Sequence, residues 1–166
     1  MRLRLVHAAI VLTAVAASCS TEPTRPIDGL RLELELGTRA GSPGHPIGVK
    51  ARVVNNGLTA VSYVIGCGAG PPIRIAFLGP GETEPFDPCR CPTPCVGPAC
   101  PDLIASLERG QVVENVATFD GTRMNCDGNC SAVAGRYTVT ATFQGNRFGA
   151  RPITLTQTKT FDWSTR

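Results

Sequence analysis

The sequence is short of aromatic side chains and has no strong excess of either charge. Aromatic residues make up 5% of the 166 residues, and basic residues outnumber acidic ones by only 16 to 13. Two of the basic residues, Arg2 and Arg4, lie near the N-terminus, so the rest of the chain is close to neutral. Binding of nucleic acid or of an anionic membrane through a polybasic surface requires concentrated positive charge. The composition therefore argues against both kinds of partner.

Histidine, the most common catalytic base of hydrolytic enzymes, is also scarce. After residue 18 the only histidine is His45, which lies in a Gly- and Pro-rich stretch without a Ser or Cys nucleophile motif. Hydrolytic nucleophiles usually need such a base. Glu33 and Glu35 share one strand face, but beside Arg31 they indicate a solvated charged face rather than a catalytic pair. With no phosphate loop or dinucleotide fingerprint either, we expect a protein that is not an enzyme and binds no cofactor.

The N-terminal 19 residues have the three parts of an export signal. Arg2 and Arg4 precede an apolar run that ends at Ala17, and this run is too short for a permanent membrane span. Ala16-Ala17-Ser18-Cys19 resembles the lipobox of bacterial lipoproteins, in which the cysteine receives diacylglycerol. We therefore expect a lipoprotein signal peptide at 1–18 and a lipidated Cys19 followed by a tether to residue 27. The alternative is an ordinary cleaved signal, with Cys19 as a disulfide partner.

The remaining chain, 28–166, is expected to form one domain rich in turns. The full sequence of 166 residues has 18 glycines and 14 prolines, which favour turns. Apolar residues alternate with polar ones in several segments of 28–166, as in half-buried strands. Asn55–Gly57 is expected to form a tight turn, since its residues tolerate positive φ, and 120–135 is expected to form a loop. We expect about seven strands, at 30–36, 47–53, 61–67, 73–77, 112–119, 137–143 and 153–163.

Strands of this number and spacing predict an all-β, immunoglobulin-like antiparallel β-sandwich. The strand at 112–119 lacks clean alternation, which suggests a bulge. In the last strand Gln157 and Lys159 interrupt the apolar face, as is typical of an edge strand. Tyr137 opens the penultimate strand and is a candidate for a tyrosine corner, in which the hydroxyl bonds a nearby backbone group.

The stretch 82–101 is different in character, since it holds many prolines and four cysteines and shows no periodicity. We expect it to be a surface loop inserted in the sandwich and braced by disulfides. An exported chain of this cysteine density favours disulfides over zinc, because C-x-C spacing does not fit zinc pairs and the compartment oxidises thiols. No metal is expected. The disulfide candidates are Cys67, Cys89, Cys91, Cys95, Cys100, Cys126 and Cys130, an odd number whose connectivity stays open.

Several turn-and-strand motifs resemble one known family. Gly44-His45-Pro46-Ile47-Gly48-Val49 followed by Val53-Val54-Asn55-Asn56-Gly57 looks like its opening motif. Leu107–Gln111 looks like its "L-x-x-G-E" turn, and Phe119-Asp120-Gly121 with Ala134–Val139 looks like its closing motif. The family is the BsuPI-type intracellular proteinase inhibitor domain, an immunoglobulin-like sandwich. The resemblance covers roughly Leu30 to Phe143, although this chain carries an export signal and a cysteine-rich loop foreign to the basic pattern.

These features together predict a non-catalytic binding module on a lipid anchor, with 82–101 as its contact surface. Its expected location is the cell envelope, outside the cytoplasm, and at an outer membrane where one is present, because Ser20 rather than Asp follows Cys19. Its partners would be the membrane and an unidentified envelope or extracellular protein. One alternative, implied by the resemblance, is a protease inhibitor. Another is a redox or metal-handling protein that uses the cysteines at 89, 91, 95 and 100.

Overall fold

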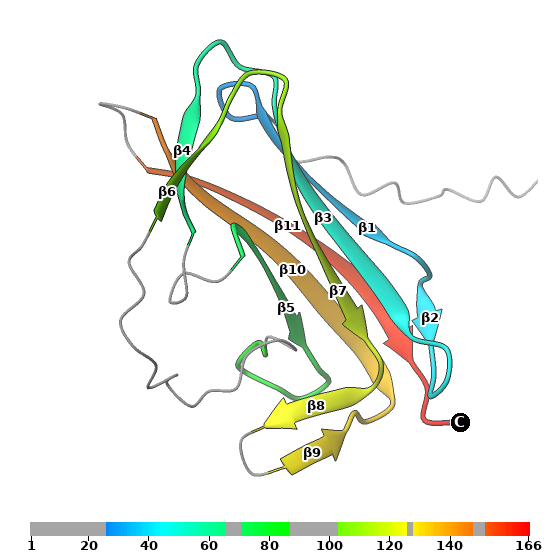
Figure 1. Ribbon diagram of the computed structural model, residues 1–166. Helices are drawn as coiled ribbons and strands as arrows, with labels where there is room; N and C mark the ends of the chain where they lie inside the picture. The colour runs from blue at the N-terminus through cyan, green and yellow to red at the C-terminus, as the bar shows by residue number, and fades with distance from the viewer. Residues whose placement is uncertain (1–25, 66–70, 87–102, 126–127, 148–151) are drawn as a thin grey trace, which may run out of the picture.

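The computed structural model describes residues 26–65, 71–86, 103–125, 128–147 and 152–166, with side chains described outside 123–130 (Figure 1). All the named elements in these ranges are β-strands. The described residues therefore contain no helix long and apolar enough to cross a membrane. The strands are β1 (Leu30–Leu36), β2 (Ala40–Gly41), β3 (Ile47–Asn55), β4 (Val61–Ile65), β5 (Ile73–Leu78), β6 (Leu103–Leu107), β7 (Val112–Phe119), β8 (Thr122–Asn125), β9 (Gly128–Ser131), β10 (Gly135–Asn146) and β11 (Pro152–Trp163).

The strands form two main sheets and a separate hairpin. The first sheet has the order β1-β3-β7, and the second has the order β2-β11-β10-β4-β6 with β5 also paired to β10. All pairs are antiparallel except the short β2–β11 pair. β8 and β9 form the hairpin. The prediction of an all-β domain built from antiparallel strands is confirmed.

One core lies between the two main sheets, and the longer strands contribute alternate residues to it. In β1 the leucines at 30, 32 and 34 are buried, whereas the residues between them are partly exposed. The same period of two runs along β3, β5, β10 and β11, because successive side chains point to opposite faces of a strand. The predicted faces of these strands are therefore the buried ones. At burial of about 25 cal/mol per Å² of apolar surface, this core is the main source of stability.

Most of the described aromatic side chains gather at one end of this core, whereas Tyr63 and Phe143 form a separate pair with ring centroids 5.9 Å apart. Phe119 is central, with ring centroids 5.2 Å from both Phe77 and Phe161, 4.9 Å from Tyr137 and 5.0 Å from Trp163. These rings come from both main sheets, since Phe119 lies in β7 and the others in β5, β10 and β11. Tilted and edge-on contacts of this kind add to the stability from burial alone. The few aromatics of the sequence thus fix how the two sheets meet.

The bulge expected in 112–119 is absent, because β7 pairs with β3 in continuous register from Val112 to Phe119. What breaks the apolar pattern is Asn115, which stands at an inward position of β7. Its side-chain amide donates a hydrogen bond to the Ile73 carbonyl in β5, at 2.7 Å. A polar residue is tolerated there because the bond links the two sheets.

The edge-strand prediction for the last strand agrees with its pairing. β11 pairs with β10 along its whole length, but its other side meets β2 only at Asp162 and Trp163. Gln157 and Lys159 lie within the stretch that has β10 alone as a neighbour, and both are partly exposed. Four strands were not predicted: β2, β6, β8 and β9. The last two replace much of the loop expected at 120–135.

The turn at 55–57 does not use the positive φ that its residues tolerate. None of Asn55–Gly57 has a positive φ, whereas Asp28 (52°) and Gly29 (81°) do. These two residues form a tight turn closed by reciprocal hydrogen bonds between Ile27 and Leu30. A Cβ on Gly29 would lie 2.5 Å from the backbone of Gly57, so the two turns touch through glycine backbone. The turn at 55–57 is held by side-chain hydrogen bonds instead.

Candidate interaction surface

The strands give the domain two distinct ends (Figure 1). We call one the tether end, which comprises 27–29, 55–60, 108–111 and Arg147. Its segments are tied together by hydrogen bonds from Asn56 N to Gly29 O (2.8 Å) and from Gly110 N to Asn55 O (2.7 Å). We call the other the far end, which comprises 79–86 and 120–135. β10 runs from the far end to the tether end, and at 3.4 Å per residue its 12 residues separate them by roughly 40 Å.

The segment 79–86 is the first part of the far end, and it is anchored to the core. Gly79 N donates to the Glu82 carboxylate (2.9 Å), and Glu82 N donates to Gly79 O (3.2 Å). Phe86 exchanges two backbone hydrogen bonds of 2.7 Å with Phe77, and their rings lie 5.9 Å apart. Phe86 therefore packs against the core. The prediction that 82–101 is a surface loop is therefore wrong for 82–86, which are hydrogen-bonded to β5 and the turn after it.

The β8–β9 hairpin is the second part of the far end. Thr122 pairs with Ser131 and Asn125 with Gly128. At its base Ala132 N donates to Gly121 O at 2.7 Å. Gly121 has a φ of 83°, and a Cβ there would lie 2.1 Å from the Trp163 ring. Only glycine satisfies both demands, so the hairpin leaves the core at a fixed point.

Tyr137 holds the far end to the start of β10. Its ring is buried in the aromatic cluster, and its hydroxyl donates a hydrogen bond of 3.0 Å to the Val133 carbonyl. This four-residue backward contact is the one that the tyrosine-corner prediction requires. Val133 itself keeps 59% of its surface exposed, so the corner presents an apolar side chain to solvent on a rigid backbone.

The cysteines named from the sequence are largely outside the described part of the chain. Cys19, Cys67 and Cys126 lie in ranges that the structure does not describe, as do those at 89, 91, 95 and 100. For Cys130 only the backbone is described, in β9 opposite Arg123. Their disulfides and the cysteine-rich remainder of the loop stay predictions.

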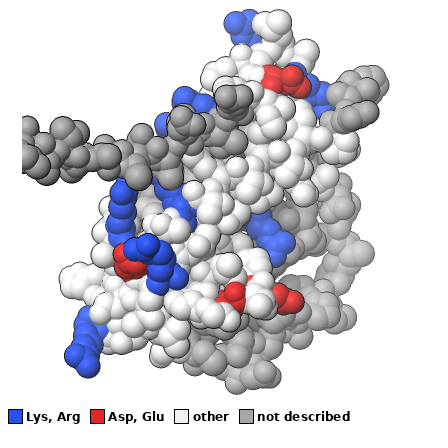
Figure 2. Space-filling model, turned by 180° about the vertical axis from the view of Figure 1, so that it is seen from behind, with Lys and Arg blue, Asp and Glu red and all other residues white. Residues whose placement is uncertain are grey.

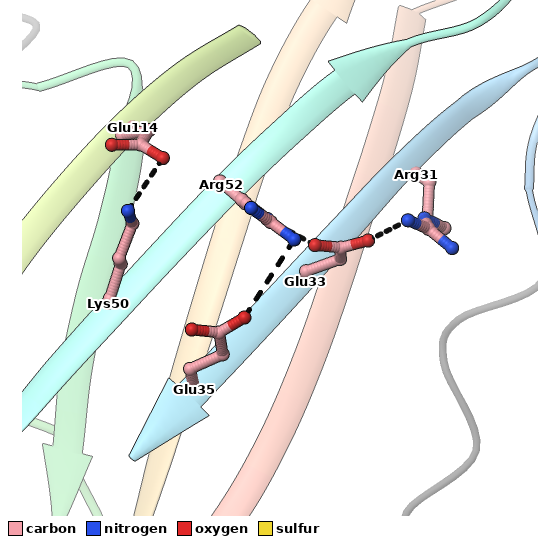
Figure 3. A network of polar contacts seen from close by, with 6 residues as sticks. All are labelled: Arg31, Glu33, Glu35, Lys50, Arg52 and Glu114. Atoms are coloured by element: carbon pink, nitrogen blue, oxygen red, sulfur yellow. Dashed lines mark hydrogen bonds and ion pairs between the residues drawn. The ribbon is translucent and has the colours of Figure 1, made fainter. Parts of the chain in front are cut away.

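The outer face of the first sheet carries a network of paired charges (Figure 3). Lys50 Nζ lies 2.9 Å from Glu114 Oε1, between β3 and β7. Glu33 pairs with both Arg31 and Arg52, and Glu35 lies 3.9 Å from Arg52. The two β1 carboxylates are thus paired with cations rather than with each other.

The network changes the pKa of Arg52. The Glu33 carboxylate accepts a hydrogen bond from Arg52 Nε, and this bond with the attraction between the two charges raises the pKa of the guanidinium above its ordinary value. A guanidinium whose pKa is raised in this way is not poised for proton transfer. Seen from behind, the molecule likewise shows basic and acidic groups interspersed among uncharged surface (Figure 2). Ion pairs at a protein surface add little to stability, because water and salt screen their charges.

Within the described ranges no three side chains of the metal-ligating types come together. His45 is exposed in a turn, where its backbone exchanges hydrogen bonds with Ser42 (2.8 and 3.2 Å). The far end combines a braced turn, a hairpin and an exposed apolar side chain at Val133.

No protein-family model and no curated protein matches the chain. Among solved structures, it is similar to the sporulation control protein Spo0M from Bacillus subtilis, at 11% identity and a TM-score of 0.43, over 84% of this chain and 51% of that chain. It is also similar to a beta-glucosidase from Listeria innocua in complex with glucose, at 9% identity and a TM-score of 0.40, over 81% of this chain and 16% of that chain. The chain thus spans about half of one neighbour and about a sixth of the other.

Proposed function

We propose that the chain is a lipid-anchored, non-catalytic binding module of the bacterial cell envelope, whose contact surface is the far end of an immunoglobulin-like sandwich. The observation that carries the proposal is the placement of 79–86 and the β8–β9 hairpin beside each other on one rigid end. A Cβ on Gly135 would lie 2.6 Å from Pro80, so 79–86 touches the start of β10, which follows the hairpin in the sequence. Loops held by a rigid scaffold are where such folds place recognition.

The cysteine-rich segment extends this surface in the proposal. It leaves the far end directly after Phe86, which is bonded to β5, and returns at Leu103 in β6. Two more cysteines belong to the sequence of the hairpin at the same end: Cys126 follows β8, and Cys130 lies in β9. Disulfides within or between these segments would restrict them and lower the entropy lost on binding. A partner protein would then meet a preorganised surface.

The anchor is tested by Cys19→Ser. If the motif Ala16-Ala17-Ser18-Cys19 directs lipidation, this substitution removes the acylated thiol, and the two or three chains that give stable anchoring are lost. We expect incorporation of labelled fatty acid to disappear and the protein to leave the membrane fraction. Labelling equal to that of the wild type would show that the lipid, if any, is elsewhere.

The contact surface is tested by capture of envelope proteins with the soluble domain from Thr21 onward. Two far-end variants, Val133→Arg and a Gly/Ser linker in place of 87–99, are expected to lose the captured partner. The linker begins after Phe86 because Phe86 packs on the core, and we expect the domain to stay folded with a loss of at most about 2–4 kcal/mol per deleted ring. Far-ultraviolet circular dichroism monitors the fold.

The matched control is Val116→Arg on β7, where the replaced valine is similarly exposed, at 64% against 59% for Val133. This variant should capture the partner like the wild type. Loss of binding by Val116→Arg with retention by Val133→Arg would move the contact surface to the first sheet. Capture of a protease that the intact domain inhibits would identify the module as an inhibitor of the BsuPI-like kind.

A further inference from the structure

The tether end carries two exposed apolar side chains close to the point where the anchor joins the domain. Ile27 is 43% exposed and precedes the turn at Asp28–Gly29, and Leu58 is 85% exposed at the tip of the turn after β3. The two turns are in contact, since Asn56 N donates to Gly29 O and the Gly29 and Gly57 backbones meet. Ile27 and Leu58 therefore project from one joined pair of turns.

A basic side chain ties these turns to the second sheet. Arg147 follows β10 and donates a hydrogen bond to the Asp28 carbonyl, while its guanidinium lies 3.8 Å from the Asp28 carboxylate. Its side chain is only 17% exposed, so it serves as a brace and presents little charge to solvent. With Arg147 holding Asp28, the end has no net acidic field to repel a phospholipid surface.

The length of the anchor decides which end of the domain can reach the membrane. From Cys19 to Ile27 are eight residue steps, which span at most about 29 Å when fully extended. The far end lies roughly 40 Å further along β10, beyond that reach in any upright arrangement. A lipid on Cys19 therefore keeps Ile27 and Leu58 near the bilayer.

We propose that the tether end docks on the lipid surface, with Ile27 and Leu58 inserted at the headgroup boundary and the far end turned outward. This rests on the proposed lipid anchor at Cys19. Burial of apolar side chains at the interface strengthens the attachment that the acyl chains provide. It also holds the domain in one orientation, which presents the far end to a partner.

The test uses the full-length acylated protein in vesicles of phosphatidylethanolamine and phosphatidylglycerol, in which part of the lipid carries bromine on its acyl chains. Leu58→Trp and Ile27→Trp place a fluorophore at the tether end, and Val133→Trp places one at the far end. The native Trp163 is 4% exposed within the aromatic cluster, so it gives a constant background and reports the fold. Bromine quenches a tryptophan only at short range.

The proposal predicts that bromine quenches Leu58→Trp and Ile27→Trp, with a blue shift of their emission. It also predicts that Val133→Trp and the wild type do not change. An acylated protein that floats with the vesicles but shows no quenching at positions 58 and 27, or stronger quenching at 133, overturns the docking and leaves the anchor intact. A protein without acyl mass that does not float overturns both.

Discussion

Val139→Asp is expected to prevent the domain from folding. Val139 is fully buried in the middle of β10, opposite Phe77 of β5 and Lys159 of β11. A carboxylate there would lose most of its water, and the partly exposed Lys159 opposite could pair with it only by giving up its own contact with solvent. We expect a cost above about 4–5 kcal/mol, which rivals the total stability of an ordinary domain at about 5–15 kcal/mol. Leu34→Asp, in the facing sheet, should behave in the same way.

The control for this prediction is Gln144→Asp in the same strand. Gln144 is exposed, so its replacement places the same charge on the outer face of β10. It should leave the circular dichroism spectrum and the urea midpoint near those of the wild type. A soluble Val139→Asp protein with a cooperative unfolding transition would mean that this face of β10 does not form the core.

Asn55→Ala is expected to be the most damaging polar substitution in the described part of the chain. The Asn55 side chain is fully buried, and its amide donates to the carbonyls of Thr59 (3.0 Å) and Leu107 (2.8 Å). Its side-chain oxygen accepts from Gly57 N at 2.9 Å. Alanine would leave these backbone groups without their partner. A stranded buried group costs about 1–3 kcal/mol, so we expect a loss of roughly 3–5 kcal/mol.

The neighbouring Asn56 provides a close control. Asn56 is exposed, and the tether end uses its backbone N–H rather than its side chain for the bond to Gly29. Asn56→Ala should therefore change the free energy of unfolding in urea by less than about 0.5 kcal/mol. Equal effects of the two substitutions would show that the side-chain bonds of Asn55 do not hold the tether end together.

The sheets could be predicted from the sequence where apolar residues alternate on one buried face. The leucines of β1 and the residues Tyr137, Val139, Ala141 and Phe143 of β10 mark inward positions directly, and the structure buries them. The pattern fails where an inward position holds a polar residue that finds its own partner. Asn115 is the example, because its bond to Ile73 O depends on a strand far away in the sequence.

The hairpin and the edge strand β6 left weaker signals. Thr122–Asn125 and Gly128–Ser131 contain mostly polar residues, so their sequences show no apolar face that would mark them as paired strands. In β6 the side chains of Leu103 and Ile104 are 58% and 79% exposed. This strand therefore has no alternation of buried apolar and exposed polar residues. Strands that bury little cannot be recognised by periodicity.

The candidate surface was only partly predictable. The unusual composition of 82–101 drew attention to that stretch, but the anchoring of Phe86 on Phe77 follows from the register of β5, which the sequence does not reveal. The contact between Pro80 and Gly135 joins segments more than fifty residues apart. Neither the pairing of these segments nor the exposure of Leu58 at the opposite end could be read from local pattern.

The central claim is that the far end, and not the tether end or the first sheet, meets the partner protein. Site-specific photo-crosslinking on the full chain in intact cells tests this most directly, with the photoreactive residue at Val133, Val116 or Leu58 in turn. All three side chains are well exposed, at 59%, 64% and 85%. The account predicts a protein adduct from position 133, none from 116, and lipid adducts from 58. A protein adduct from 116 or 58 with none from 133 would contradict it.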